Sequence, residues 1–137
     1  MARPVTQPSG WGTEWTTEEY HAHVAKTMSE TALEDCVLDL AGHLGWLRFH
    51  ALPVTNRKGR TRTAQRGDIG FPDLVLVHPL GALVVRELKS ERGSPSPEQK
   101  RWLAGFTAAG VDTGIWKPRH WFDGTIRARL SEVPPSR

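Results

Sequence analysis

Two apolar runs joined by a short turn constrain the fold of this chain more than any other feature. The runs span residues 71–77 and 82–89, and Pro79, Leu80 and Gly81 separate them. Runs of this length that are rich in Val and Leu and bounded by Pro and Gly predict the two strands of an antiparallel hairpin. The second run ends in Glu87-Leu88-Lys89, which packing alone does not require.

Helical and strand patterns flank this hairpin. Leu33, Val37 and Leu40 recur at three- and four-residue steps, which predicts a helix over 29–44 with Ser29 as its N-cap. The other predicted elements are a strand at 46–50, a helix at 97–109 that Ser96 can cap, a strand at 111–116 and a last helix at 125–132. The sequence therefore predicts an α/β fold in the order helix, three strands, helix, strand, with a mixed four-stranded sheet flanked by helices.

The chain has 137 residues, enough for one domain with one core. We expect an N-terminal extension at 1–28, with helical character at 16–26, a domain at 29–133 and a tail at 134–137. Residues 51–70 are predicted to form a long polar loop. A loop of that length in a compact domain is usually functional or mobile.

Positive charge is concentrated in that loop. The formal net charge of the chain is only +3, yet no acidic residue lies between Arg48 and Arg66. The basic residues that follow Arg48 are Arg57, Lys58, Arg60, Arg62 and Arg66. We expect either a solvated surface loop or a segment that contacts phosphate groups.

The single cysteine, Cys36, excludes an intramolecular disulfide and a multi-cysteine zinc site. Together with the lack of a signal-peptide pattern, this leads us to expect a cytoplasmic protein. No apolar stretch approaches the length of a membrane span, so no membrane is expected among its partners. Cys36 lies on the apolar side of the first predicted helix, which indicates a core residue rather than a nucleophile.

Acidic and basic side chains meet at one end of the predicted hairpin. Asp73 opens the first strand, and alternation places Glu87 and Lys89 on the same face of the second. Two carboxylates at strand ends offer the hard oxygen ligands that Mg²⁺ takes while it keeps water and substrate phosphate. A neighbouring lysine can orient the attacking water and stabilise charge on a phosphate.

The first helix adds a candidate acid. Glu34 falls within the apolar arc of this helix, where a carboxylate needs a partner. Glu30 also lies on this side, but in the first turn, where it favours the helix dipole. We therefore favour Glu34 over Glu30 as a site residue. The alternatives for Glu34 are a partly exposed edge residue or an ion pair with an arginine.

These residues resemble a known nuclease signature. Pro72-Asp73 followed by Glu87-Leu88-Lys89 is similar to the motif of the restriction-endonuclease-like nuclease superfamily. The wider string of residues 70–74, Glu87 to Ser90, Ser96 to Gln99, Trp102 and Gly110 resembles the virus-type replication-repair nuclease domain, VRR-NUC. The resemblance covers about residues 29–117.

The resemblance implies a role for each matching residue. Asp73 and Glu87 are implied to bind Mg²⁺ or Mn²⁺, helped by Glu34 and the carbonyl group of Leu88. Lys89 is implied to be the catalytic lysine, and Gln99 to approach the catalytic centre or the phosphate. Ser90 is expected to form local hydrogen bonds or to contact phosphate, beside the basic loop.

The resemblance also implies an activity. We expect a metal-dependent, structure-selective DNA endonuclease in which metal-activated water attacks a phosphodiester. By analogy, it acts as a homodimeric Holliday-junction resolvase involved in DNA repair, in a bacterial or phage-infected cell. The alternatives are a monomeric flap or single-strand nuclease, a non-catalytic DNA-binding module with the same fold, and a purely structural protein.

Four aromatic residues outside this motif receive simpler interpretations. His50 is interpreted as a surface residue, with a contact to DNA or to the metal site as the alternative. His78, beside Pro79, is interpreted as a turn residue. Trp102 and Trp116 are predicted to be core aromatics rather than platforms for base stacking.

Overall fold

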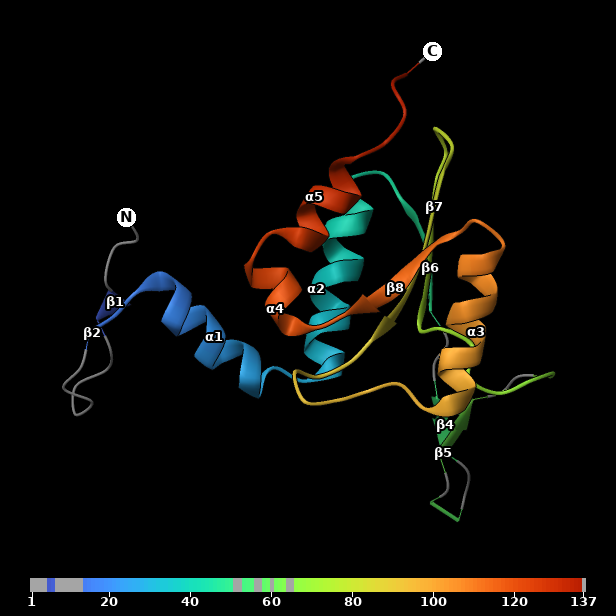
Figure 1. The fold of residues 1–137 in the computed structure, drawn as a ribbon, viewed down its shortest axis with the longest axis horizontal. Coiled ribbons are helices and arrows are strands. Elements are labelled where there is room, and N and C mark those ends of the chain that lie inside the picture. The colour runs from blue at the N-terminus through green and yellow to red at the C-terminus, as the bar shows by residue number, and fades with distance from the viewer. Residues whose placement is uncertain are drawn as a thin grey trace.

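A four-stranded mixed sheet organises the protein, as the sequence predicts (Figure 1). The computed structural model describes residues 5–6, 14–50, 53–55, 58–59, 61–63 and 66–136. The strands of the main sheet are β3 (Leu47–His50), β6 (Leu74–His78), β7 (Ala82–Leu88) and β8 (Asp112–Trp116). Their order is β3-β6-β7-β8, with β6 antiparallel to both β3 and β7, and β8 parallel to β7. The predicted fold class is confirmed.

Helices cover both faces of this sheet. They are α1 (Thr17–Thr27), α2 (Glu30–His43), α3 (Pro97–Ala108), α4 (Pro118–Phe122) and α5 (Thr125–Ser131). Figure 1 shows α2, α4 and α5 on one side of the sheet and α3 on the other. The α3 helix provides the crossover that the parallel pair β7 and β8 needs. None of the helices in the described ranges has the length and apolar character needed to span a bilayer.

The main core lies between the sheet and α2. The Ser29 hydroxyl oxygen accepts a hydrogen bond from the Ala32 N–H and begins α2 as predicted. Leu33, Val37 and Ala41 then lie fully buried along one stripe of the helix. The sheet and the C-terminal helices complete this core with Leu74, Leu76, Val84, Leu88, Trp46, Trp116, Ile126 and Leu130. Each fully buried Leu or Val contributes about 1.5–3 kcal/mol to the stability of the fold.

The hairpin between β6 and β7 turns at Gly81, which has a φ of +104° and donates its N–H to the His78 carbonyl oxygen. The interpretation of His78 as a turn residue is confirmed by this hydrogen bond, and its side chain is in addition buried. Its Nε2 lies 3.1 Å from the Leu44 carbonyl oxygen, and its ring packs edge-on against Trp46. His78 thus joins the hairpin to the end of α2.

The prediction of an irregular loop over residues 51–70 is wrong in part. Two strands, β4 (Pro53–Thr55) and β5 (Thr61–Thr63), pair antiparallel within it. Threonine and valine supply most of these positions, and such β-branched residues favour extended backbone. The alternation was too short to indicate this hairpin from the sequence alone.

The N-terminal helix α1 packs against α4, which follows β8 in the C-terminal part of the chain. The α1 helix confirms the helical character expected near 16–26, and the His21 and Phe122 rings stack at 5.0 Å. The sequence analysis did not predict α4 itself. Two short strands, β1 (Val5–Thr6) and β2 (Glu14–Trp15), pair before α1. The expected domain boundaries at residues 28 and 133 stay predictions.

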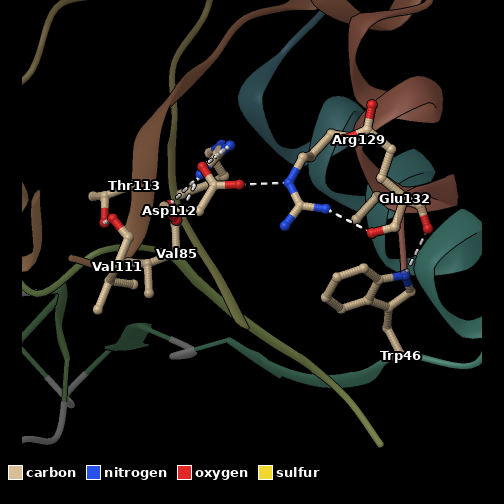
Figure 2. Close-up of polar contacts among 9 residues, drawn as sticks. Trp46, Val85, Val111, Asp112, Thr113, Arg129 and Glu132 are labelled. Carbon is tan, nitrogen blue, oxygen red and sulfur yellow. Dashed lines mark hydrogen bonds and ion pairs between the residues drawn. The ribbon is translucent and has the colours of Figure 1, made fainter. Parts of the chain in front are cut away.

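An ionic network ties β8 to the C-terminal helices (Figure 2). The Asp112 carboxylate pairs with Arg86 at 2.7 Å and with the guanidinium of Arg129. Burial raises the pKa of Asp112, but hydrogen bonds from Arg129 and Arg86 outweigh it and hold the pKa below its usual value. The Arg86 guanidinium also lies 4.7 Å from the centre of a Trp116 ring. This network is structural and lies apart from the site described below.

Candidate active site

The ends of β6 and β7 bring Asp73, Glu87 and Lys89 together. Asp73 comes one residue before β6, and its Oδ2 accepts a hydrogen bond from the Leu88 N–H at 2.8 Å. Lys89 comes one residue after β7, and its Nζ lies 3.5 Å from the Glu87 Oε1. The structure therefore places these three side chains at one end of the hairpin, as the sequence pattern predicts.

Glu87 is the most buried acid of this group. Its side chain is 1% exposed, and its Oε2 has no hydrogen-bond partner among the described residues. Burial and, after it, the nearby Asp73 carboxyl raise the pKa of Glu87 to about 8, although Lys89 opposes both. Because it costs free energy to keep this buried carboxylate charged, a positive partner at its Oε2 atom would be favourable.

Gln99 reaches Glu87 from the first turn of α3. Its Nε2 donates a hydrogen bond to the Glu87 Oε1 at 2.8 Å. Its Oε1 accepts the Ser96 N–H, while the Ser96 hydroxyl oxygen accepts the Gln99 N–H. This capping box begins α3 at the predicted residue and fixes the orientation of the Gln99 amide.

Gly70 allows the start of α3 to approach this end of the sheet. Its φ is +94°, and a Cβ at this position would lie 2.6 Å from the carbonyl carbon of Glu98. No other residue type fits this contact without a shift of backbone. The segment that leads to Asp73 is thereby packed against the helix that carries Gln99.

Glu34 approaches the site from α2 and pairs with His50. Its Oε1 lies 3.2 Å from the His50 Nδ1, and about a fifth of each side chain is exposed. Burial raises the pKa of Glu34, His50 opposes this, and the charge of Asp73 adds to it. The partner is thus a histidine rather than an arginine, and the interpretation of His50 as a surface residue is wrong. The register of β3 against β6 brings His50 to this end of the sheet, because His50 pairs with Leu74, the residue after Asp73.

Two further predicted residues have backbone contacts at the site. The Ser90 N–H donates to the Glu30 Oε1 at 3.4 Å, so Glu30 also faces this end of the sheet. The Leu88 side chain is buried in the core, and its N–H is engaged by Asp73. Coordination of a metal by the Leu88 carbonyl group stays a prediction.

The carboxylates form a pair rather than a cluster of three. Within the described ranges, no three His, Cys, Asp or Glu residues are gathered so that they could hold a metal ion. Glu87 lies on the α3 face of the sheet, with Gln99, whereas Glu34 comes from α2 on the opposite face. Asp73 and Glu87 remain a two-carboxylate site, which is enough for Mg²⁺ that keeps several waters.

The predicted phosphate-binding residues are described only in part. Lys58 and Arg66 are exposed. Arg57 and Arg60, as well as the side chain of Arg62 in β5, lie outside the described residues. Arg48, at the start of this basic stretch, donates to the Leu38 carbonyl oxygen of α2 at 3.1 Å. Contact of this segment with phosphate stays a prediction.

The two tryptophans that were predicted to lie in the core differ in their burial. Trp116 is buried in the core, as predicted. Trp102 is only partly buried, and its Nε1–H donates to the Ile69 carbonyl oxygen at 3.0 Å. Its indole packs against Phe71 and Phe106 on the α3 side of the sheet. Cys36 is half-buried on α2, at the edge of the predicted core.

Comparisons with known proteins agree with the signature found in the sequence. The model of the VRR-NUC domain family matches residues 44–118, which include Asp73, Glu87, Lys89 and Gln99 but not Glu34. A solved structure titled "VRR_NUC domain" is similar to 82% of this chain and 97% of its own, with 23% sequence identity and a TM-score of 0.46. No curated protein matches the chain.

Proposed function

Because the chain belongs to the VRR-NUC domain family and has a nuclease-type fold, we propose that it is a metal-dependent, structure-selective DNA endonuclease. One observation carries the proposal. Within the part of the chain that the structure describes, the buried Oε2 of Glu87 has no hydrogen-bond partner, although Glu87 lies in a group with Asp73, Lys89 and Gln99. A divalent cation would supply the missing positive partner and hold Glu87 in its charged form.

Asp73 and Glu87 are the residues that would hold Mg²⁺ or Mn²⁺, with the Leu88 carbonyl group as a further candidate, whereas Glu34 pairs with His50 outside this two-carboxylate site. When bound, the cation would act as a Lewis acid that lowers the pKa of water and stabilises negative charge on the phosphate. The Leu88 N–H fixes one oxygen of Asp73, and Gln99 fixes one oxygen of Glu87. Each carboxylate is thereby oriented before any ligand arrives.

Lys89 would act on the reacting groups directly. Its side chain is 14% exposed, and its Nζ lies 3.5 Å from the Glu87 Oε1, which restricts its position. From there Lys89 would orient the attacking water and donate hydrogen bonds to a phosphate oxygen as charge develops in the transition state. Ser90 and the basic residues Arg57, Lys58, Arg60, Arg62 and Arg66 would contact the flanking phosphates, which positions DNA without reading its sequence.

Branched DNA is the substrate that we favour, cut by a homodimer in the manner of a Holliday-junction resolvase. Symmetric cutting of a junction needs two copies of the site. An exposed apolar face supports a second copy: Leu47, Val77 and Leu83 lie in register across β3, β6 and β7, and Phe49 lies two residues further along β3 on the same face. The second candidate is a monomeric nuclease for flaps or single strands. Within this proposal the protein works in the cytoplasm, in DNA repair of a bacterial or phage-infected cell.

Cleavage of labelled duplex, single-stranded, flapped and four-way-junction DNA tests the proposal. Each substrate is incubated with Mg²⁺, Mn²⁺ or EDTA and with the native protein, Lys89→Ala or Lys100→Ala. Lys100 is an exposed lysine on α3 and serves as the matched control. We expect metal-dependent cutting that Lys89→Ala lowers by about 10²–10⁴-fold and Lys100→Ala leaves unchanged.

The substrate that is cut fastest decides between the two nuclease candidates. Symmetric cuts in the junction favour the resolvase, and cuts restricted to flaps or single strands favour the monomer. If no DNA is cut with either metal while binding persists, the nuclease proposal fails and a non-catalytic DNA-binding module takes its place.

A further inference from the structure

A pocket lies along α3, next to the proposed catalytic group. Its volume is about 460 Å³, within the range of small-molecule sites. The apolar part of its lining comes from Ile69, Trp102, Phe106 and Ala109. Ile69 is 65% exposed, although it is a large aliphatic residue. The aromatic rings and the aliphatic side chain form a surface suited to a flat apolar ligand.

Charged residues complete the lining of this pocket. They are Asp68, Glu98 and Arg101. Two carboxylates against one guanidinium give the lining a net negative charge, which repels a phosphate group. The same carboxylates can accept hydrogen bonds from exocyclic amino groups, and a guanidinium can donate to ring nitrogens and carbonyl oxygens of bases. The charges therefore match the edge of a nucleobase and disfavour the DNA backbone.

The position of the pocket links it to the catalytic group. Trp102 follows Gln99 by three residues on α3, a rise of about 4.5 Å along the helix axis. The pocket therefore begins within one helical turn of the Gln99 amide that contacts Glu87. The hydrogen bond from Trp102 to the Ile69 carbonyl group holds the other wall of the pocket four residues before Asp73.

We propose that this pocket binds an unpaired nucleobase of the DNA substrate, stacked against the Trp102 and Phe106 side chains near the cleaved phosphodiester. The inference rests on the proposed function in taking DNA as the substrate, and it adds a reason for selectivity. A base within a regular duplex is not free to enter a pocket, whereas a base at a branch, flap or single strand is.

A substitution at Gly105 can fill the pocket without displacing neighbouring atoms. This glycine lines the pocket from the interior of α3, and a Cβ added there would meet nothing within 4 Å. Gly105→Leu places an aliphatic side chain in the space of the base, and it replaces a poor helix former by a good one. Ala104→Leu, on the neighbouring exposed position that does not line the pocket, is the matched control.

Binding is measured by fluorescence anisotropy in EDTA, so that no DNA is cut. The probes are a single-stranded oligonucleotide, the same strand with its bases replaced by abasic sites, and a blunt duplex of the same sequence. Since stacking of one base contributes about 1–3 kcal/mol, we expect the native protein to bind the base-bearing strand about 5- to 150-fold more tightly than the abasic strand. Gly105→Leu should abolish most of this preference, and Ala104→Leu should retain it.

Two outcomes would overturn the inference: equal binding of the base-bearing and abasic strands by the native protein, or an unchanged preference in Gly105→Leu. Thermal unfolding of Gly105→Leu confirms that the variant is folded. The binding assay does not depend on catalysis. A protein that cuts DNA but shows no base preference lacks this pocket function, and a protein that shows the preference but cuts nothing lacks the nuclease function.

Discussion

At the scale of single residues, Glu87 is the group whose charge is most difficult to accommodate. It is almost fully buried, its Oε2 has no hydrogen-bond partner among the residues that the structure describes, and the nearby Asp73 repels it. Lys89 and Gln99 compensate for this only in part. An unfavourable buried charge of this kind is expected at a functional site, where a bound ligand supplies the positive partner of Glu87.

The cation-free protein should lose stability as the pH rises from about 5 to about 8. Burial and the neighbouring Asp73 raise the pKa of Glu87 from 4.5 to about 8, so the folded state binds a proton in this range that the unfolded state has released. The free energy of unfolding therefore falls with increasing pH until the folded-state pKa is passed. Urea unfolding in EDTA at several pH values measures this dependence.

Glu87→Gln provides the control for this dependence. The amide cannot ionise, so the variant should lose less stability between pH 5 and pH 8, and at pH 8 it should be the more stable protein by about 1–3 kcal/mol. Mg²⁺ should stabilise the native protein at pH 8 and leave Glu87→Gln almost unaffected. Parallel stability curves for the two proteins would show that Glu87 is not the group that titrates.

At the scale of elements, the site depends on how closely α3 approaches the residues that precede β6. Gly70 permits this approach, and the capping box of Ser96 and Gln99 fixes the direction of the helix. Gly70 lies before β6 and the capping box begins α3, yet both determine where the Gln99 amide lies relative to Glu87. The geometry of the site is therefore as sensitive to Gly70 as to the polar residues themselves.

Gly70→Ala should destabilise the protein more than Gly81→Ala. Both glycines have positive φ values, so alanine costs about 1–2 kcal/mol at either position. At Gly81 the added Cβ meets nothing within 4 Å, whereas at Gly70 it would lie 2.6 Å from the Glu98 backbone. We expect a further loss of about 1–3 kcal/mol for Gly70→Ala, measured by urea unfolding. Equal losses for the two variants would contradict the close packing of α3.

At the scale of the whole molecule, one face of the sheet is covered unevenly. The α2 side carries the core, but α3 covers the other side only toward β7 and β8. The uncovered part presents Leu47, Phe49, Val77 and Leu83, and the first two are 64% and 58% exposed. A row of large apolar side chains at this position is typical of an interface.

If two copies meet through this face, Phe49→Glu should prevent their association. A symmetric interface buries each residue twice, so the loss of two buried Phe side chains costs about 3–6 kcal/mol, more than a hundredfold in the dissociation constant of the dimer. Sedimentation velocity over a range of concentrations measures this. Tyr20→Glu, which alters an exposed aromatic residue on α1, is the control. A native protein that remains a monomer at high concentration would refute the dimer.

Features that depend on local pattern could be predicted from the amino-acid sequence. Three-residue and four-residue spacing predicted α2, capping residues predicted where α2 and α3 begin, and alternation placed Glu87 and Val84 on opposite faces of β7. The short turn at Gly81 ensured that Asp73 and Glu87 would meet. These features could be predicted because each depends on residues that are close along the chain.

Features that depend on partners distant along the chain became visible in the folded protein alone. His50 meets Glu34 because β3 pairs with β6 and α2 lies across them, and His78 is buried because it reaches the end of α2. The partial exposure of Trp102 depends on how far α3 extends over the sheet. A side chain's burial and charge are set by its neighbours in space, and one sequence specifies those neighbours only through the complete fold.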